Sequence, residues 1–280
     1  MRPLLAILVL VAILLSSMIL SSCSMDGFLF NADPLAEYTL SGAIIPDTSR
    51  IEVSMASDGE TIYGYYVRQP DSMRVNPHPV IIYHHGNKDN LQLYWERIEL
   101  LYTAGFDVFI YDYRGYGKST GTSSESTLRT DARAALTYVL SRKDVDSTQI
   151  VHYGFSLGGF PALYSATALH KPKALITESV FASGEALVQS GTLLNIPGSY
   201  LLEGTFDNLA PIQQRTCPVL LLHGTSDAFI RLETNGQRLY DVARQPKTFI
   251  QVNGAAHDNV PNTMGTQEYI DRITAFIRGS

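Results

Sequence analysis

One serine in the sequence stands in a setting that suits a nucleophile. Residues Gly154 to Gly158 read Gly-Phe-Ser-Leu-Gly, and they follow the apolar run Ile150 to Tyr153. With a strand before it and a helix beginning near Gly159, this motif places Ser156 on a sharp turn with its hydroxyl presented for reaction. A serine hydroxyl is a poor nucleophile without a neighbouring base. The motif therefore predicts a serine nucleophile with an acid and a histidine later in the chain.

Asp227 and His257 are the residues that fit those two roles. Asp227 comes soon after the apolar run Val219 to Leu222, and His257 comes soon after Thr248 to Val252. The carboxyl ends of parallel strands lie at one edge of a sheet, where ligand sites form. We expect His257 to take the Ser156 proton, and Asp227 to fix the tautomer of the imidazole.

Two alternatives to this assignment remain on the sequence alone. Glu178 ends the run Ala174 to Thr177 and is a second candidate for the acid. His84 and His85 end another apolar run and could suggest a metal site. No carboxylate or third histidine stands near them at ligand spacing, so no metal is expected.

Two backbone N–H groups are candidates for an oxyanion hole. Leu157 directly follows the nucleophile, at the start of the predicted helix, where the helix dipole favours negative charge. Asn87 lies in the loop His85-Gly86-Asn87, after the first strand expected to be parallel. The alternative for this second segment is a simple turn.

The elements that must position these residues alternate between strand and helix. Arg50 to Ala56 and Glu60 to Val67 flank Ser57-Asp58-Gly59 and predict a hairpin. Beyond them, short apolar runs alternate with segments of helical spacing, which predicts an α/β fold with a mostly parallel sheet and helices on both faces.

The segment 182–216 interrupts this alternation and is too long for a simple connection. Long insertions between core elements usually form lids or binding loops, so we expect a small cap there. Its apolar residues favour an acyl or alkyl pocket. They are Leu187, Leu193, Leu194, Ile196, Leu201 and Leu202.

The first residues have the pattern of an export signal. Arg2 precedes the unbroken apolar run Leu4 to Leu15, and small residues follow it. Leu20-Ser21-Ser22-Cys23 resembles the lipobox of bacterial lipoproteins, in which the cysteine is acylated and begins the mature chain. The resemblance implies a membrane-anchored protein of the cell envelope, at the outer membrane or periplasmic face if the cell is diderm and at the cell surface otherwise. The alternatives are an uncleaved signal anchor or a full transmembrane helix.

This interpretation divides the chain into a signal peptide at 1–22, a tether at 23–49 and one domain at 50–280. The 280 residues are 45% apolar and 17% charged, which excludes disordered, collagen-like and coiled-coil chains. The net charge of −6 and the absence of basic runs argue against nucleic-acid binding. With Cys23 lipidated, Cys217 is the remaining thiol, and we expect it to be buried.

Together these residues resemble the α/β-hydrolase superfamily from about Arg50 to the end of the chain. His85-Gly86-Asn87 and the segment Asp112 to Ser119 are similar to the branch that holds monoglyceride lipases, small serine aminopeptidases and thioesterase-like hydrolases. The resemblance implies hydrolysis of an ester, thioester or amide through an acyl-enzyme, without a cofactor. Fold analogy alone does not select the substrate.

Three functions therefore stand as hypotheses. The first is a lipid-anchored serine hydrolase acting on a small ester or acyl substrate. The second is a peptidase, which would need an acidic group to hold a free amino terminus; the predicted cap offers Glu185, Glu203 and Asp207. The third is a binding protein that has lost turnover, and a complete set of Ser156, Asp227 and His257 disfavours it.

Overall fold

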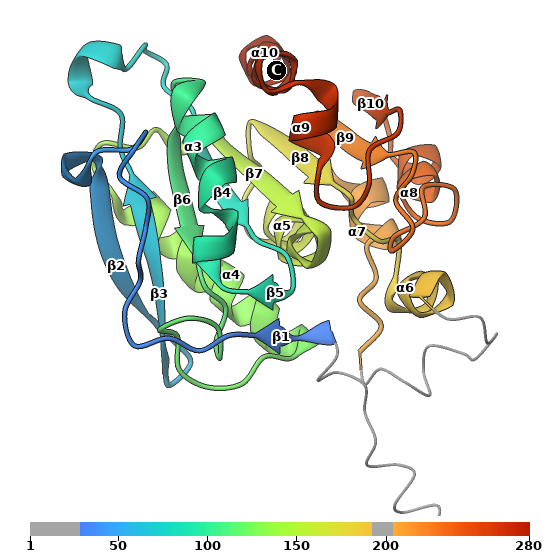
Figure 1. The fold of residues 1–280 in the computed structure, drawn as a ribbon, viewed down its shortest axis with the longest axis horizontal. Helices are drawn as coiled ribbons and strands as arrows, with labels where there is room; N and C mark the ends of the chain where they lie inside the picture. Colours follow the sequence, from blue (N-terminus) through green and yellow to red (C-terminus); the bar gives the residue numbers. More distant parts are fainter. Residues whose placement is uncertain (1–28, 192–203) are drawn as a thin grey trace, which may run out of the picture.

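A single eight-stranded sheet forms the centre of the molecule, in the order β10-β9-β8-β7-β4-β6-β3-β2. The computed structural model describes residues 29–191 and 204–280 (Figure 1). The strands are β2 (Arg50–Ser57), β3 (Glu60–Val67), β4 (Val80–His84), β6 (Asp107–Tyr111), β7 (Ile150–Phe155), β8 (Ala174–Glu178), β9 (Val219–Gly224) and β10 (Lys247–Val252). β2, β3 and β6 pair antiparallel, and all other neighbours are parallel. The predicted mostly parallel α/β fold and its hairpin are confirmed.

Helices cover both faces of the sheet because neighbouring strand residues point to opposite sides. Ile81 and Tyr83 of β4 pack in one cluster with α3 and α10, whereas Val80 and Ile82 pack in another with α4. α5 and α8 extend the second face over β8 and β9. The helices are α3 (Trp95–Thr103), α4 (Glu125–Ser141), α5 (Gly159–Tyr164), α6 (Gly184–Gly191), α7 (Leu209–Gln214), α8 (Gly236–Val242), α9 (Val260–Met264) and α10 (Thr266–Gly279).

The predicted cap segment contains α6 and α7. Phe206, on the way back to the sheet, is fully buried, and its ring contacts those of Phe30, Phe160 and Phe181. The Phe206 N–H donates to the Glu125 carboxylate at 3.0 Å, which fixes the returning chain to the start of α4. Of the apolar residues predicted for the cap, Leu187 packs beside this aromatic cluster. Leu193, Leu194, Ile196, Leu201 and Leu202 lie outside the described residues.

Residues 29–38, here called the N-terminal strap, lie along the domain edge. The two-residue strand β1 (Asn31–Ala32) pairs in parallel with β5 (Lys88–Asp89), just after the loop that carries Asn87. The Tyr38 hydroxyl donates to Asp112 at 2.6 Å. The segment predicted as a tether and approach is therefore in contact with the domain from Leu29 onward. Across 29–191 and 204–280, no helix combines the length and apolar character needed to span a bilayer.

Candidate active site

Ser156 occupies a strained turn between β7 and α5. Its φ is 52°, a left-handed value that few non-glycine residues adopt, and Ser156 is only 3% exposed to solvent. The short 3-10 turn Ser156–Gly158 leads directly into α5. A Cβ on Gly154 would lie 2.5 Å from the Gly158 carbonyl oxygen, and one on Gly158 would lie 1.9 Å from that of His84. The two glycines of the motif therefore allow the strand, the turn and β4 to come together.

The three residues selected in the sequence form one hydrogen-bonded chain. His257 Nε2 lies 3.0 Å from Ser156 Oγ, and His257 Nδ1 lies 2.8 Å from Asp227 Oδ2. The Asp227 side chain is fully buried, whereas the His257 side chain retains 21% exposure. This arrangement gives a serine hydroxyl a base within reach and gives the base a buried carboxylate on its other nitrogen.

Asp227 and His257 meet because the loops after β9 and β10 lie against each other. The Ser226 N–H donates to the Ala255 carbonyl at 2.9 Å. A Cβ on Gly224 would lie 2.2 Å from that same carbonyl oxygen, so only glycine allows this approach. Parallel pairing of β9 with β10 brings both loops to the edge where β7 presents Ser156.

The surroundings of His257 are largely aromatic. Its ring centroid lies 5.3 Å from that of Phe155 and 5.1 Å from that of Phe229. Phe229 remains 46% exposed at the rim of the site. Beneath, burial lowers the pKa of His223, and its Nε2–H donates to the Ile230 carbonyl at 2.7 Å. His223 therefore stays neutral and leaves the charge of Asp227 for His257.

The loop that carries Asn87 lies beside the nucleophile turn. Gly158 approaches the carbonyls of both His84 and His85, and a Cβ on Gly86 would lie 3.1 Å from the Phe155 ring. The Tyr116 hydroxyl donates to the Asn87 carbonyl at 3.0 Å. Leu157 is the second residue of the Ser156–Gly158 turn, so its N–H is one of those that the helical turn cannot satisfy internally. Both predicted oxyanion donors thus lie on segments adjoining Ser156.

Comparison with known proteins places the chain in a family. Residues 79–183 match the family described as alpha/beta hydrolase fold. The chain is 31% identical over 231 residues to YfhR, an uncharacterized protein of Escherichia coli K12, covering 79% of this chain and 78% of YfhR. It is also 30% identical to the uncharacterized Rv2307c of Mycobacterium tuberculosis, covering 87% and 84% of the two chains. The chain belongs to the α/β-hydrolase family that contains YfhR.

Solved α/β hydrolases share the fold at low sequence identity. The Pyrococcus furiosus esterase Pf2001 superposes with a TM-score of 0.70 and 16% identity, over 89% of this chain and 98% of that one. An acetyl xylan esterase from Paenibacillus sp. R4 gives a TM-score of 0.68 at 20% identity, over 88% and 89%. The fold predicted from the sequence is therefore that of known esterases.

Glu178, the alternative acid, has other partners in this α/β hydrolase. Its Oε1 pairs with Arg97 at 2.5 Å, and its Oε2 accepts the hydroxyls of Tyr153 and, at 2.8 Å, Tyr269. It makes no hydrogen bond to His257 in the described part of the chain. The structure therefore joins Asp227 to the histidine and places Glu178 beneath the site.

The two histidines considered for a metal also have protein partners. His84 Nε2 lies 3.0 Å from His152 Nδ1, and its Nδ1 lies 2.9 Å from the Tyr111 hydroxyl. His85 Nδ1 lies 2.7 Å from the Gly86 carbonyl. Within the described ranges, no three histidine, cysteine or acidic side chains are grouped as metal ligands would be.

Of the remaining predicted residues, Cys217 is buried, and burial raises the pKa of its thiol, which keeps it protonated and unreactive. Asp207 accepts the N–H of Leu209 at 2.9 Å at the start of α7. The exposed Glu185 accepts from Gln189 at 2.8 Å. Cys23 and Glu203 lie outside the described residues.

Sequence reasoning did not select Arg97, Tyr116 or Phe229. Arg97 lies in α3, outside every motif, and an arginine on a helix has no distinguishing pattern. Tyr116 lies within the Asp112 to Ser119 segment that carried a family resemblance, and that segment was the available signal. Phe229 follows Asp227 by two residues, and only the folded turn brings its ring to His257.

Proposed function

We propose that the protein is a serine hydrolase that cleaves a carboxylic ester or thioester through an acyl-enzyme on Ser156. The observation that carries the proposal is the hydrogen-bonded chain from Ser156 through His257 to Asp227, with the serine held at a left-handed φ. Such a turn keeps the hydroxyl presented to substrate, and the buried carboxylate stabilises the imidazolium that forms during the reaction.

In the first half of the reaction, His257 Nε2 removes the proton from Ser156 as Oγ attacks the carbonyl carbon. The resulting oxyanion lies toward the N–H groups of Leu157 and Asn87, which we assign as its donors. The intermediate collapses as the bond from carbon to the leaving oxygen or sulfur breaks, and His257 returns the proton to the departing alcohol or thiol. Ser156 then carries the acyl group as an ester.

Water completes the reaction by the same chemistry. His257 takes a proton from a water molecule as its oxygen attacks the acyl carbon, and the proton returns to Ser156 Oγ when the ester bond to the enzyme breaks. Every proton in this cycle passes through His257, so this mechanism uses no cofactor. Asp227 holds Nδ1–H in place, which keeps Nε2 free to act as the base.

Ester substrates are favoured by the apolar surroundings and by the structural neighbours. A buried apolar cluster lies beside the nucleophile, and Leu187 of α6 packs against it. Its members include Leu157, Phe160, Phe181 and Phe206. The neighbours include esterases from Pyrococcus furiosus and Rhodococcus sp. ECU1013. A small acyl group bound against such side chains would be held by the hydrophobic effect.

We further propose that the protein is exported and anchored to a membrane of the cell envelope by a lipid on Cys23. The support is the sequence Leu20-Ser21-Ser22-Cys23 at the end of the apolar run. Several acyl chains on one cysteine give stable anchoring, whereas a single chain binds only marginally.

The function is tested with a chain beginning at Met25, which retains the whole N-terminal strap. A fluorophosphonate probe should label it, and peptide mapping should place the adduct on Ser156. p-Nitrophenyl esters and aminoacyl-anilides are then compared as substrates. Faster turnover of the esters supports the proposal, faster turnover of the anilides indicates a peptidase, and the absence of both labelling and turnover would indicate a non-catalytic binding protein.

A further inference from the structure

Arg97 reaches the catalytic edge of the sheet from α3 and contacts three separate parts of the chain. Its Nη1 pairs with Glu178 Oε1 at 2.5 Å, at the end of β8. Its Nη2 donates to the Asp258 carbonyl at 2.8 Å. The guanidinium carbon lies 4.2 Å from the centroid of the Phe155 ring. One planar cation therefore joins three segments that are far apart in the sequence.

Two of those contacts fall on the chain neighbours of the triad. Phe155 immediately precedes Ser156, and Asp258 immediately follows His257. The Phe155 ring also contacts the His257 imidazole, at a centroid distance of 5.3 Å. Arg97 thus stacks on the ring against which His257 packs and holds the backbone next to His257 by a charge-assisted hydrogen bond.

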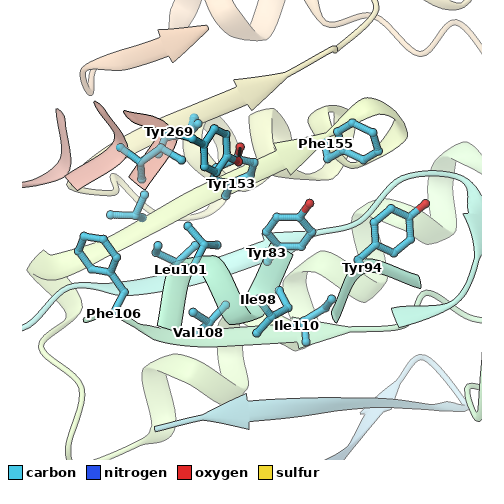
Figure 2. Packing of buried hydrophobic residues seen from close by; sticks show 14 of the residues in the cluster. Tyr83, Tyr94, Ile98, Leu101, Phe106, Val108, Ile110, Tyr153, Phe155 and Tyr269 are labelled. Carbon is cyan, nitrogen blue, oxygen red and sulfur yellow. Dashed lines mark hydrogen bonds between the residues drawn. The ribbon is translucent and has the colours of Figure 1, made fainter. Parts of the chain in front are cut away.

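Glu178 keeps this guanidinium in place. The Glu178 side chain is fully buried and the Arg97 side chain is 11% exposed. Burial opposes the charge of Arg97, but the Glu178 carboxylate and the neighbouring tyrosine side chains together outweigh burial and hold the pKa of Arg97 well above its usual value. The second Glu178 oxygen accepts the hydroxyls of Tyr153 and Tyr269, which lie side by side in Figure 2 with Phe155 further along the strand of Tyr153. The carboxylate is thus itself fixed by β7 and α10.

We propose that Arg97 is a positioning residue, anchored by Glu178, that sets the distance between Ser156 and His257. The proposal rests on the proposed function of the triad, because these contacts of Arg97 are to neighbours of the triad and not to its reacting atoms. The separation of 3.0 Å between Ser156 and His257 depends on two loops from different strands. Misplacing reacting groups by about 1 Å can lower a rate about 10²-fold.

A matched pair of double variants separates positioning from stability. Arg97→Met with Glu178→Gln removes both charges of this pair, so neither is left buried alone. The control is Arg74→Met with Asp107→Asn, which removes both charges of a pair of similar burial: the Arg74 side chain is 15% exposed and that of Asp107 is 0% exposed. Asp107 is the first residue of β6, so this pair lies at the amino ends of the parallel strands, away from the triad. We expect kcat of the Arg97 variant to fall about 10- to 10²-fold with KM changed less than about threefold. The Arg74 variant should keep the wild-type kcat.

The conservative variant Arg97→Lys adds a second readout. A lysine can pair with Glu178 but cannot also present a planar fork to Phe155 and the Asp258 carbonyl. We therefore expect its kcat to lie between those of the wild type and the double variant. If the Arg97 double variant keeps the wild-type kcat, or if both double variants lose kcat in proportion to their loss of Tm, the positioning role is wrong.

Amide hydrogen exchange tests the proposal without a substrate. Exchange of residues 253–259 should be faster in the Arg97 double variant than in the wild type, and unchanged in the Arg74 double variant. Equal exchange of this loop in both variants would overturn the proposal even in an active enzyme. A wild-type protein that hydrolyses no ester and takes no probe would instead overturn the proposed function, and the exchange result would still stand.

Discussion

Asp227 gives His257 only one of its two carboxylate oxygens. Oδ2 lies 2.8 Å from His257 Nδ1, while Oδ1 accepts the N–H groups of Phe229 at 3.0 Å and Ile230 at 2.7 Å. The carboxylate therefore cannot rotate without losing backbone hydrogen bonds. This division determines what an amide would do in the same place.

Asp227→Asn should lower kcat by about 10³- to 10⁴-fold with little change in KM. The amide oxygen would keep the two backbone donors, so the NH₂ group would face His257 Nδ1. The imidazole would then carry its proton on Nε2 and could not accept one from Ser156. Glu178→Gln should cost far less, because its amide oxygen can still accept from Arg97. Steady-state kinetics of both folded variants decide the matter, and the opposite ranking would make Glu178 the acid.

Replacing the nucleophile should reveal the strain in its turn. Ser156→Ala should abolish fluorophosphonate labelling and nearly all turnover. Ser156→Gly should have the same effect on labelling and turnover. It should be more stable than Ser156→Ala by up to about 1 kcal/mol in unfolding free energy, because glycine adopts a φ of 52° without steric cost. Calorimetry of the two variants measures this difference. A Ser156→Gly variant less stable than Ser156→Ala would mean that the turn stores little strain, because the larger entropy loss of glycine on folding would then dominate.

The buried pair of His84 and His152 should make the fold sensitive to acid. Burial lowers the pKa of His152 to about 3 and that of His84 well below its usual value of 6.5. Below pH 6.5 these two histidines bind protons in the unfolded chain but stay neutral in the folded chain. The unfolding free energy therefore decreases as the pH drops, by up to about 1.4 kcal/mol per pH unit for each histidine. Above pH 6.5 the two contribute no pH dependence.

His152→Gln removes one of these titrations and keeps a side chain that can hydrogen-bond His84. Between pH 6.5 and pH 4, the unfolding free energy of this variant should depend on pH less steeply than that of the wild type, by about one proton. Denaturant unfolding across this range gives both slopes. Identical slopes would show that His152 titrates normally in the folded protein.

Leu193 and Leu194 are predicted to limit the length of the acyl group. Burying each added methylene is worth up to about 0.8 kcal/mol, so kcat/KM should rise up to about fourfold per CH₂ until the pocket is full. Replacing both leucines by alanine should move the optimum to longer chains and leave acetyl esters nearly unaffected. The measurement is kcat/KM over a series of ester lengths, and an unchanged profile would remove these leucines from the acyl site.

The N-terminal strap should support the loop of Asn87, whereas the residues before it should not affect catalysis. A chain beginning at Met25 should have the full kcat. A chain beginning at Thr39 loses both the pairing of β1 with β5 and the hydrogen bond from Tyr38 to Asp112, so its kcat should fall about 10- to 10²-fold. A full kcat from the shorter chain would show that the loop holds its shape alone.

Lipidation of Cys23 is tested in cells. Cys23→Ala should prevent uptake of a clickable palmitate analogue; a wild type without label would favour a signal anchor.

Local patterns were enough to predict the core elements and to bring together the triad. β-Branched runs such as Val80 to Tyr83 identify buried strands, and the glycines around Ser156 identify the turn, because both signals lie within a few neighbouring residues. The rule that the carboxyl ends of parallel strands share one edge then relates Asp227 to His257.

Features that depend on distant contacts could not be predicted in this way. Arg97 and Glu178 are 81 residues apart, and no local sequence pattern around either residue predicts that the two form an ion pair. The strap has no periodic pattern because it lies along the domain edge through scattered hydrogen bonds, for example from Leu35 to the Gly117 carbonyl. Its sequence therefore resembles that of a free tether, although its residues contact the domain.

The strap also has a consequence for the order in which the chain can assemble. Asn31 pairs with Lys88, and Leu35 donates to the Gly117 carbonyl, so neither contact can form until residues that leave the ribosome much later are present. Closing such long loops costs entropy before any contact repays it. The earliest described residues of the chain are thus among those that must wait for later ones, and β1 gains its β5 partner only after the chain has extended well beyond β1.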